Sequence, residues 1–143
     1  MEQINFKGLT VGLVDERGEI AAIYKGVAQN DLGLRTDILD NVPKSIGMKM
    51  LIRSMSPKVI CADEIGSIED VEAINYAICC GIKGIFTAHG SSLEDLSLNP
   101  AIRNILNLHV FERIVVLNDK ETKGEIDKVY SLNKINSDYI LIN

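Results

Sequence analysis

The residues Val59-Ile60-Cys61-Ala62-Asp63-Glu64 form a short apolar run that ends in two acidic side chains. Runs that are continuously apolar, without alternation, are typical of parallel strands buried on both faces. Three further runs have the same apolar character: residues 9–14, which precede Asp15 and Glu16, residues 85–88, which precede His89, and residues 114–117.

Segments with helical periodicity separate these runs. Pro43 suits the first turn of one helix, Ser67 suits the N-cap of a second, and a weaker helix is expected over 100–108. Strands that alternate with helices predict an α/β fold, with a mostly parallel sheet, helices on both faces and right-handed crossovers. We expect these side chains to face the core: Ile46, Met50, Leu51 and Met55 in the first helix, and Val71, Ile74, Ala77 and Ile78 in the second.

The C-terminal residues break this alternation. Residues 129–132 and 139–142 predict two antiparallel strands joined across 133–138. We therefore expect residues 1–120 to form the core and residues 121–143 to form a short β extension of the same domain.

Composition restricts the function further. The 143 residues carry a net charge of −5, which argues against binding to nucleic acid through a basic surface. An apolar share of 46% is ordinary for a packed domain. No apolar run reaches the ~20 residues of a membrane-spanning helix, and no secretory signal is visible, so we expect a cytoplasmic protein.

Reactive side chains follow three of the four apolar runs. The carboxyl ends of parallel strands meet at one edge of a sheet, where ligands bind. An apolar run followed by Asp-Glu has the Walker B form, in which Asp63 would order a magnesium ion and Glu64 would polarise an attacking water. His89 is a candidate to sense the γ-phosphate or orient that water, although a lone histidine is more often satisfied within a turn. Arginines near element ends are candidates for phosphate oxygens, although most arginines are solvated: Arg17, Arg35, Arg53 and Arg113.

The sequence contains neither G-x-x-x-x-G-K-[ST] nor a G-x-G-x-x-G that opens a helix. A nucleoside triphosphate needs a nest of backbone N–H groups and a lysine for its β- and γ-phosphates. The chain thus offers the magnesium and water half of a nucleotide site without the phosphate half.

Six stretches, in the right order and spacing, resemble the stage III sporulation protein AA family. The resemblance covers almost all of residues 9–118, and the six stretches are 14–20 (VDERGEI), 29–37 (QNDLGLRTD), 50–57 (MLIRSMSP), 63–66 (DEIG), 87–90 (TAHG) and 110–113 (VFER). The resemblance implies a P-loop ATPase with a RecA-like core, related to the type II and type IV secretion ATPases, that uses ATP and Mg²⁺. It also implies a cytoplasmic homo-oligomer, a hexamer when intact, on the mother-cell side of the forespore membrane. Its partners would be the membrane-embedded stage III sporulation channel proteins, with no nucleic acid.

The resemblance also assigns roles to residues. Thr87 and His89 fall at a sensor or histidine-box position, and Asp15, Glu16 and Arg17 match an acidic motif that faces the phosphates. The resulting assignment is catalytic for Glu16, Glu64 and His89, nucleotide-binding for Asp15, Arg17, Arg35, Arg53 and Thr87, and magnesium-binding for Asp63.

The chain departs from the family at its start, because relatives carry a Walker A loop ahead of the first strand found in this sequence. We expect either a fragment of a longer protein or a product that has lost its nucleotide-binding half. The missing strand would leave the strand near Ile85 with an open edge, or pair it with the strand near Val115. An open apolar edge favours self-association or a partner that supplies the missing half.

Three functions remain open on these grounds. The first is the C-terminal portion of a sporulation ATPase that energises the mother cell–forespore channel and is inactive alone. The second is a non-catalytic assembly module that kept the fold. The third, against which the family resemblance weighs, is a receiver-type phosphoacceptor that would use Asp63, Thr87 and Lys120.

Overall fold

The computed structural model describes residues 8–118, 122 and 124–142. The chain divides into two compact units, Met1–Ala88 and His89–Asn143. The division lies between Ala88 and His89, and β5 (Arg113–Leu117) belongs to the second unit together with the residues 121–143 that were expected to form a β extension.

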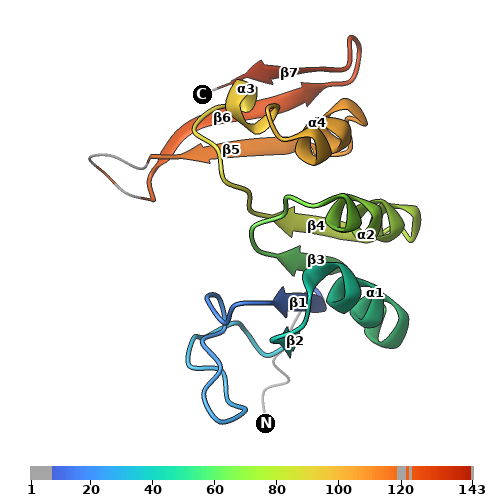
Figure 1. Ribbon diagram of the computed structural model, residues 1–143, viewed down its shortest axis with the longest axis vertical. Helices are drawn as coiled ribbons and strands as arrows, with labels where there is room; N and C mark the ends of the chain where they lie inside the picture. Colours follow the sequence, from blue (N-terminus) through green and yellow to red (C-terminus); the bar gives the residue numbers. More distant parts are fainter. Residues whose placement is uncertain (1–7, 119–121, 123, 143) are drawn as a thin grey trace, which may run out of the picture. The chain divides into compact units, whose positions relative to one another are not determined.

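The first unit is built around a four-stranded parallel sheet (Figure 1). The strands lie in the order β2-β1-β3-β4, and each of the three neighbouring pairs is parallel. The predicted α/β class with a mostly parallel sheet is therefore confirmed. The elements are β1 (Val11–Asp15), β2 (Thr36–Asp40), α1 (Lys44–Met55), β3 (Val59–Ala62), α2 (Ile68–Cys79) and β4 (Lys83–Phe86).

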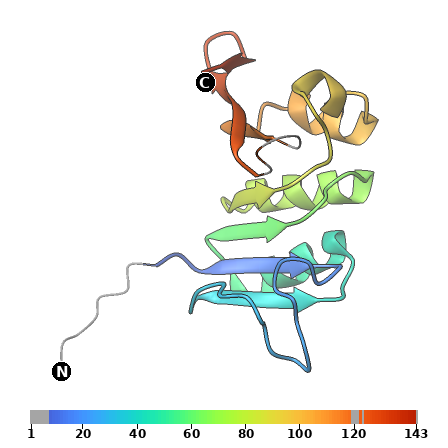
Figure 2. The ribbon, with the colours of Figure 1, turned by 90° about the vertical axis from the view of Figure 1, so that its left-hand side faces the viewer.

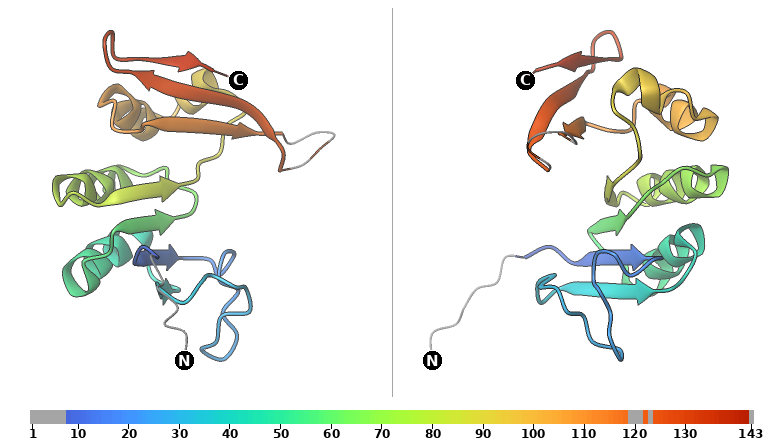
Figure 3. Two further views of the ribbon diagram at one scale, coloured as in Figure 1. Left: turned by 180° about the vertical axis from the view of Figure 1, so that it is seen from behind. Right: turned by 60° about the vertical axis from the view of Figure 1, so that its left-hand side comes forward.

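Both helices of this unit lie on the same face of the sheet, where they pack against each other (Figure 3). We expected helices on both faces. The crossovers through α1 and α2 step in the same direction along the sheet, and right-handed crossovers of the same direction lie on the same face. The connection that steps the other way, from β1 to β2, is an irregular loop over residues 16–35.

The close approach of α1 to β1 sets which face of the helix is buried. A Cβ atom on Gly47 would lie 2.6 Å from Val14 Cγ1, so the helix meets the strand at its glycine. The buried residues of α1 are accordingly Gly47, Met48, Leu51 and Ile52. The predicted stripe is wrong except at Leu51, because Ile46, Met50 and Met55 are about half exposed.

Helix α2 follows the sequence more closely. The Ser67 side chain accepts a hydrogen bond from the Asp70 N–H, and the Asp70 carboxylate accepts one from the Ser67 N–H, which forms a capping box. Three of the four side chains expected in the core are buried: Val71, Ile74 and Ala77. The fourth, Ile78, is 40% exposed.

The second unit contains an antiparallel three-stranded sheet in the order β5-β6-β7 (Figure 2). The expected C-terminal hairpin is confirmed, because β6 (Ile126–Asn133) pairs antiparallel with β7 (Asp138–Leu141). Strand β5 was expected to be parallel, which is wrong: it pairs antiparallel with β6. Although its run is continuously apolar, burial alternates along the strand: Val116 is buried, whereas Val115 and Leu117 are exposed.

Two helices precede these strands. Helix α3 (Leu93–Leu96) was not predicted, and α4 (Pro100–Asn107) matches the weak helix expected near these residues. Asn99 caps α4 by accepting from the N–H groups of Ala101 and Ile102. In the described parts of the chain, no helix is long and apolar enough to cross a bilayer.

Candidate active site

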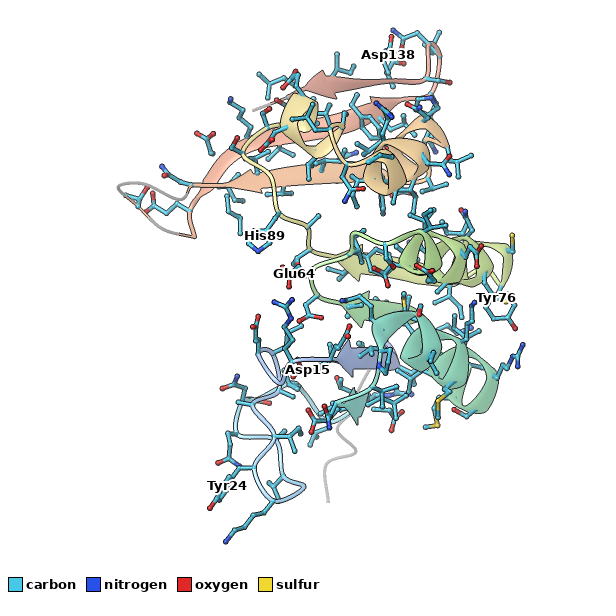
Figure 4. All side chains as sticks on the ribbon, in the orientation of Figure 1. Asp15, Tyr24, Glu64, Tyr76, His89 and Asp138 are labelled. Atoms are coloured by element: carbon cyan, nitrogen blue, oxygen red, sulfur yellow. The ribbon has the colours of Figure 1, made fainter. Side chains whose placement is uncertain are left out.

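Four of the predicted residues gather at the carboxyl edge of the parallel sheet. Asp15 is the last residue of β1, Asp63 and Glu64 follow β3, and Thr87 follows β4. Figure 4 shows Asp15 and Glu64 near the arrowheads of these strands. The strand ends of the first unit thus bring these four side chains to one edge of the sheet.

Asp15 is fully buried and bound to its own loop. Its Oδ1 accepts from the Glu19 N–H at 2.9 Å, and its Oδ2 accepts from the Ile20 and Ala21 N–H groups at 3.2 and 2.7 Å. Both carboxylate oxygens thus fold the start of the long loop back onto the strand end. This fold directs the next two residues, Glu16 and Arg17, to the neighbouring elements.

Glu16 forms an ion pair with Lys44, the first residue of α1. The Lys44 Nζ donates to Glu16 Oε2 at 2.7 Å, and the Lys44 N–H donates to the same oxygen at 3.3 Å. The hydrogen bond from the Lys44 side chain lowers the pKa of Glu16 below its ordinary value. Burial acts to lower the pKa of Lys44, but Glu16, Asp70 and Asp63 outweigh it and raise that pKa.

Lys44 is the residue of this edge that the sequence reasoning missed. Its side chain is only 13% exposed, and its charge faces three carboxylates that come from three different segments. A signal was present in the sequence. A lysine directly after the proline of a helix start lies at the positive end of the helix dipole, where cations are disfavoured unless acids surround them.

Asp63 is a buried carboxylate, 6% exposed. Among the described residues, neither of its oxygens has a hydrogen-bond partner. A carboxylate in this situation is costly, and in native structures such an orphan points to a bound water or ion. Mg²⁺ is commonly held by one or two carboxylates together with waters and substrate phosphates, so a single free carboxylate fits this ion. A cage of three or more protein ligands is not found within the described ranges.

Glu64 lies beside Asp63 but points to solvent and to Arg17. The guanidinium of Arg17 approaches Glu64 Oε2 at 2.6 Å, with side chains 59% and 31% exposed. The backbone N–H of Glu64 donates to the Thr87 hydroxyl at 2.9 Å. The end of β4 thereby contacts the turn that follows β3.

Two predicted arginines are not brought to this edge. Arg35 precedes β2, where its carbonyl accepts from the N–H of Val11, the first residue of β1, so it lies at the amino edge. Arg53 stacks over the ring of Tyr76 at 5.9 Å, and Figure 4 shows Tyr76 at the far end of the helices. A nucleotide contact from either residue within this edge is therefore not supported by the geometry.

Two further candidates belong to the second unit. His89 is exposed and is the first residue of that unit. Arg113 opens β5, and its guanidinium donates to the Ser131 hydroxyl at 2.7 Å. Lys120, which the receiver alternative needs, lies outside the described residues.

Comparison with known proteins identifies a family, a related sequence and a related fold. A family profile described as "Sporulation stage III, protein AA" matches residues 2–136. The stage III sporulation protein AA of Bacillus subtilis is 39% identical over 126 residues, which make up 88% of this chain and 41% of that protein. The X-ray structure of the Legionella pneumophila ATPase DotB resembles this chain with a TM-score of 0.59 and 13% identity. That match covers 89% of this chain and 38% of DotB, and it concerns the fold alone.

Proposed function

Because the chain belongs to the stage III sporulation protein AA family, we propose that it carries the magnesium- and water-activating half of a sporulation ATPase site. The observation that supports this most directly is the buried carboxylate of Asp63, whose oxygens have no hydrogen-bond partner among the described residues. It is followed at once by a second acid, the partly exposed Glu64, at the carboxyl edge of a parallel sheet.

In this proposal the residues of the edge divide the work. Asp63 would hold the magnesium ion, which supplies charge neutralisation for the phosphates when it is bound. Glu64 would accept a proton from the attacking water. Arg17 would face the γ-phosphate, and Glu16, fixed by Lys44, would keep the acidic loop in place. His89 belongs to the second unit and keeps, as a proposal, the catalytic role that the family resemblance implies for it.

The chain matches 41% of the length of the Bacillus subtilis relative. The ATPase activity of the whole protein is therefore proposed here as well. The sequence contains no Walker A loop, and a base or charge contact speeds a reaction only on a substrate that is held. We therefore expect negligible ATP hydrolysis by this chain alone. In the complete assembly it would act within a homo-oligomer, against the stage III channel proteins of the forespore membrane, on the mother-cell side.

The first test is a titration of magnesium-ATP into the purified chain, beside the Asp63→Ala variant. We expect no saturable nucleotide binding in either. Saturable binding that Asp63→Ala abolishes would mean that the chain builds a complete nucleotide site, against the proposal of a half-site.

The second test joins this chain to the part of the Bacillus subtilis protein that lies outside the match. We expect ATP turnover that Glu64→Gln lowers by about 10² to 10⁴, as for the loss of a general base. The matched control is Glu69→Gln, an exposed acid in the first turn of α2. Turnover that ignores Glu64→Gln would remove Glu64 as the base, and an absence of turnover would favour the assembly module.

A further inference from the structure

The backbone of Glu64 is in an unusual conformation. Its φ is +42°, in the left-handed region that residues other than glycine, asparagine and aspartate rarely adopt. Conformations of this kind persist only where the surroundings hold them, and they cluster at functional sites. Contacts with neighbouring residues therefore have to hold the backbone of Glu64 in this conformation.

Thr87 contributes to the surroundings that hold the backbone of Glu64. Its hydroxyl oxygen accepts from the Glu64 N–H at 2.9 Å, and its carbonyl oxygen accepts from the Ile65 N–H at 2.8 Å. Its own N–H donates to the Ala62 carbonyl at 3.3 Å. These bonds enclose Asp63 and Glu64 between the last residue of β3 and the first residue beyond the turn.

We propose that Thr87 is a positioning residue, whose hydroxyl holds the backbone of Glu64 in the left-handed conformation and so fixes its carboxylate at the sheet edge. The role assigned to Glu64 rests on the proposed function, whereas the backbone part of the proposal does not. The family resemblance instead implies that Thr87 is a nucleotide-binding residue. The two assignments predict different measurements.

Thr10 offers a matched control at the opposite end of the same sheet. Its hydroxyl accepts from the Lys58 N–H at 3.2 Å, and its carbonyl accepts from the Val59 N–H at 3.1 Å. The Lys58 N–H also donates to the Thr10 carbonyl at 2.9 Å, and this threonine lies before β1, away from the acidic residues. A Thr10→Val variant therefore removes a threonine hydroxyl that accepts from a backbone N–H, without touching the site.

The first measurement uses this chain and NMR, and needs no activity. In Thr87→Val, we expect the Glu64 amide to exchange with solvent roughly fivefold faster, the factor of one neutral hydrogen bond. The coupling between its amide and α protons should also change as φ leaves +42°. Thr87→Ser should restore both values, and Thr10→Val should leave residue 64 unchanged. An unchanged exchange rate and coupling in Thr87→Val would overturn the proposal.

Stability gives a second measurement, which also serves if Thr87→Val folds poorly. Glycine adopts positive φ without strain, so a Glu64→Gly background removes the need for a clamp. We expect Thr87→Val to lower the urea midpoint less in that background than in the parent chain. Equal losses in the two backgrounds would mean that the hydroxyl does not hold this conformation.

Turnover of the joined protein separates positioning from direct contact. A positioning role predicts that Thr87→Val lowers kcat, leaves the Kd of magnesium-nucleotide unchanged, and causes no further loss in a Glu64→Gln background. A raised Kd with unchanged kcat would instead assign Thr87 to the nucleotide. If the joined protein shows no turnover at all, the proposed function fails, and the NMR measurement still decides the role of Thr87.

Discussion

Two buried acids at the sheet edge have opposite circumstances. The Asp70 carboxylate accepts from the N–H groups of Gly66 and Ser67 at 3.1 and 3.0 Å, so it caps α2. The Asp63 carboxylate is buried to the same degree, yet both of its oxygens are without a partner among the described residues. A buried carboxylate such as Asp63, which lowers the stability of the free protein and lies at the carboxyl edge of a sheet, has the properties of a ligand-binding residue.

We predict that Asp63→Asn stabilises the chain by about 1 kcal/mol in the absence of Mg²⁺, because it removes a buried charge whose oxygens have no hydrogen-bond partner among the described residues. Asp70→Asn should destabilise it by about 1 kcal/mol, because the cap loses its charged acceptor. Urea denaturation in the presence of a chelator measures both. A loss of stability in Asp63→Asn would show that its carboxylate is satisfied in solution.

The Glu16–Lys44 pair predicts a pH dependence. The pKa of Glu16 is lowered in the folded chain, so its contribution is present above the ordinary value of 4.5 and is lost as the pH falls through the folded value. The pKa of Lys44 is raised, so its contribution remains complete at neutral pH.

Glu16→Gln should therefore lower the free energy of unfolding by about 0.5 kcal/mol at pH 7, a small effect because the Glu16 side chain is 37% exposed. The difference from the parent chain should vanish in acid, below the folded pKa of Glu16. Denaturation at a series of pH values measures this, with the exposed neighbour Glu19→Gln as a control. A constant difference across the series would rule out the ion pair as its source.

At the scale of elements, the sequence predicted the strands of the parallel sheet that contain a continuous apolar run and missed β2, which contains none. β3 begins and ends where its apolar run does, and β4 begins two residues before the run at 85. β2 reads Thr-Asp-Ile-Leu-Asp and lies at the sheet edge, so it lacks the continuous apolar run that marks a central strand. Without β2, the sequence could not reveal that Arg35 lies at the amino edge. The buried face of α1 was missed because a glycine, not a large apolar residue, makes its closest contact.

That contact makes Gly47→Ala a test of the helix–strand packing. Alanine favours a helix over glycine by about 1 kcal/mol, but its Cβ would lie 2.6 Å from Val14 Cγ1. We expect overpacking to prevail, with a net loss of about 1–3 kcal/mol in the free energy of unfolding. In a Val14→Ala background the same change should become neutral or stabilising. A higher free energy of unfolding for Gly47→Ala in the parent chain would contradict the close approach of α1 to Val14.

At the scale of the whole molecule, each unit has a sheet with its own edges. β4 is the last strand of the parallel sheet, and β5 is the first strand of the antiparallel one. Both carry exposed apolar side chains: Ile85 at 64%, Val115 at 46% and Leu117 at 57%. The expected open edge near Ile85 is thus present within its own sheet, and such edges tend to pair with other chains.

We predict concentration-dependent self-association of this chain, weakened by Ile85→Lys because a charge on an edge strand opposes pairing. Sedimentation velocity over a range of concentrations measures it. Ile68→Lys, which changes an exposed residue at the start of α2, is the control and should associate like the parent chain. A monomer at every concentration would refute the prediction.

The hydrogen bonds of Thr87 link the conformation of Glu64 to the stability of β4, which is an edge strand. Outer strands open more readily than central ones, and β4 has a hydrogen-bonded neighbour in its sheet on one side, β3. Opening of β4 would break the hydrogen bond between Thr87 and Glu64. The turn after β3 is therefore ordered only while β4 is paired with β3. A partner that covers the outer edge of β4 should therefore also restrict the backbone conformation of Glu64. Hydrogen exchange of the β4 amides and of the Glu64 amide should then slow together.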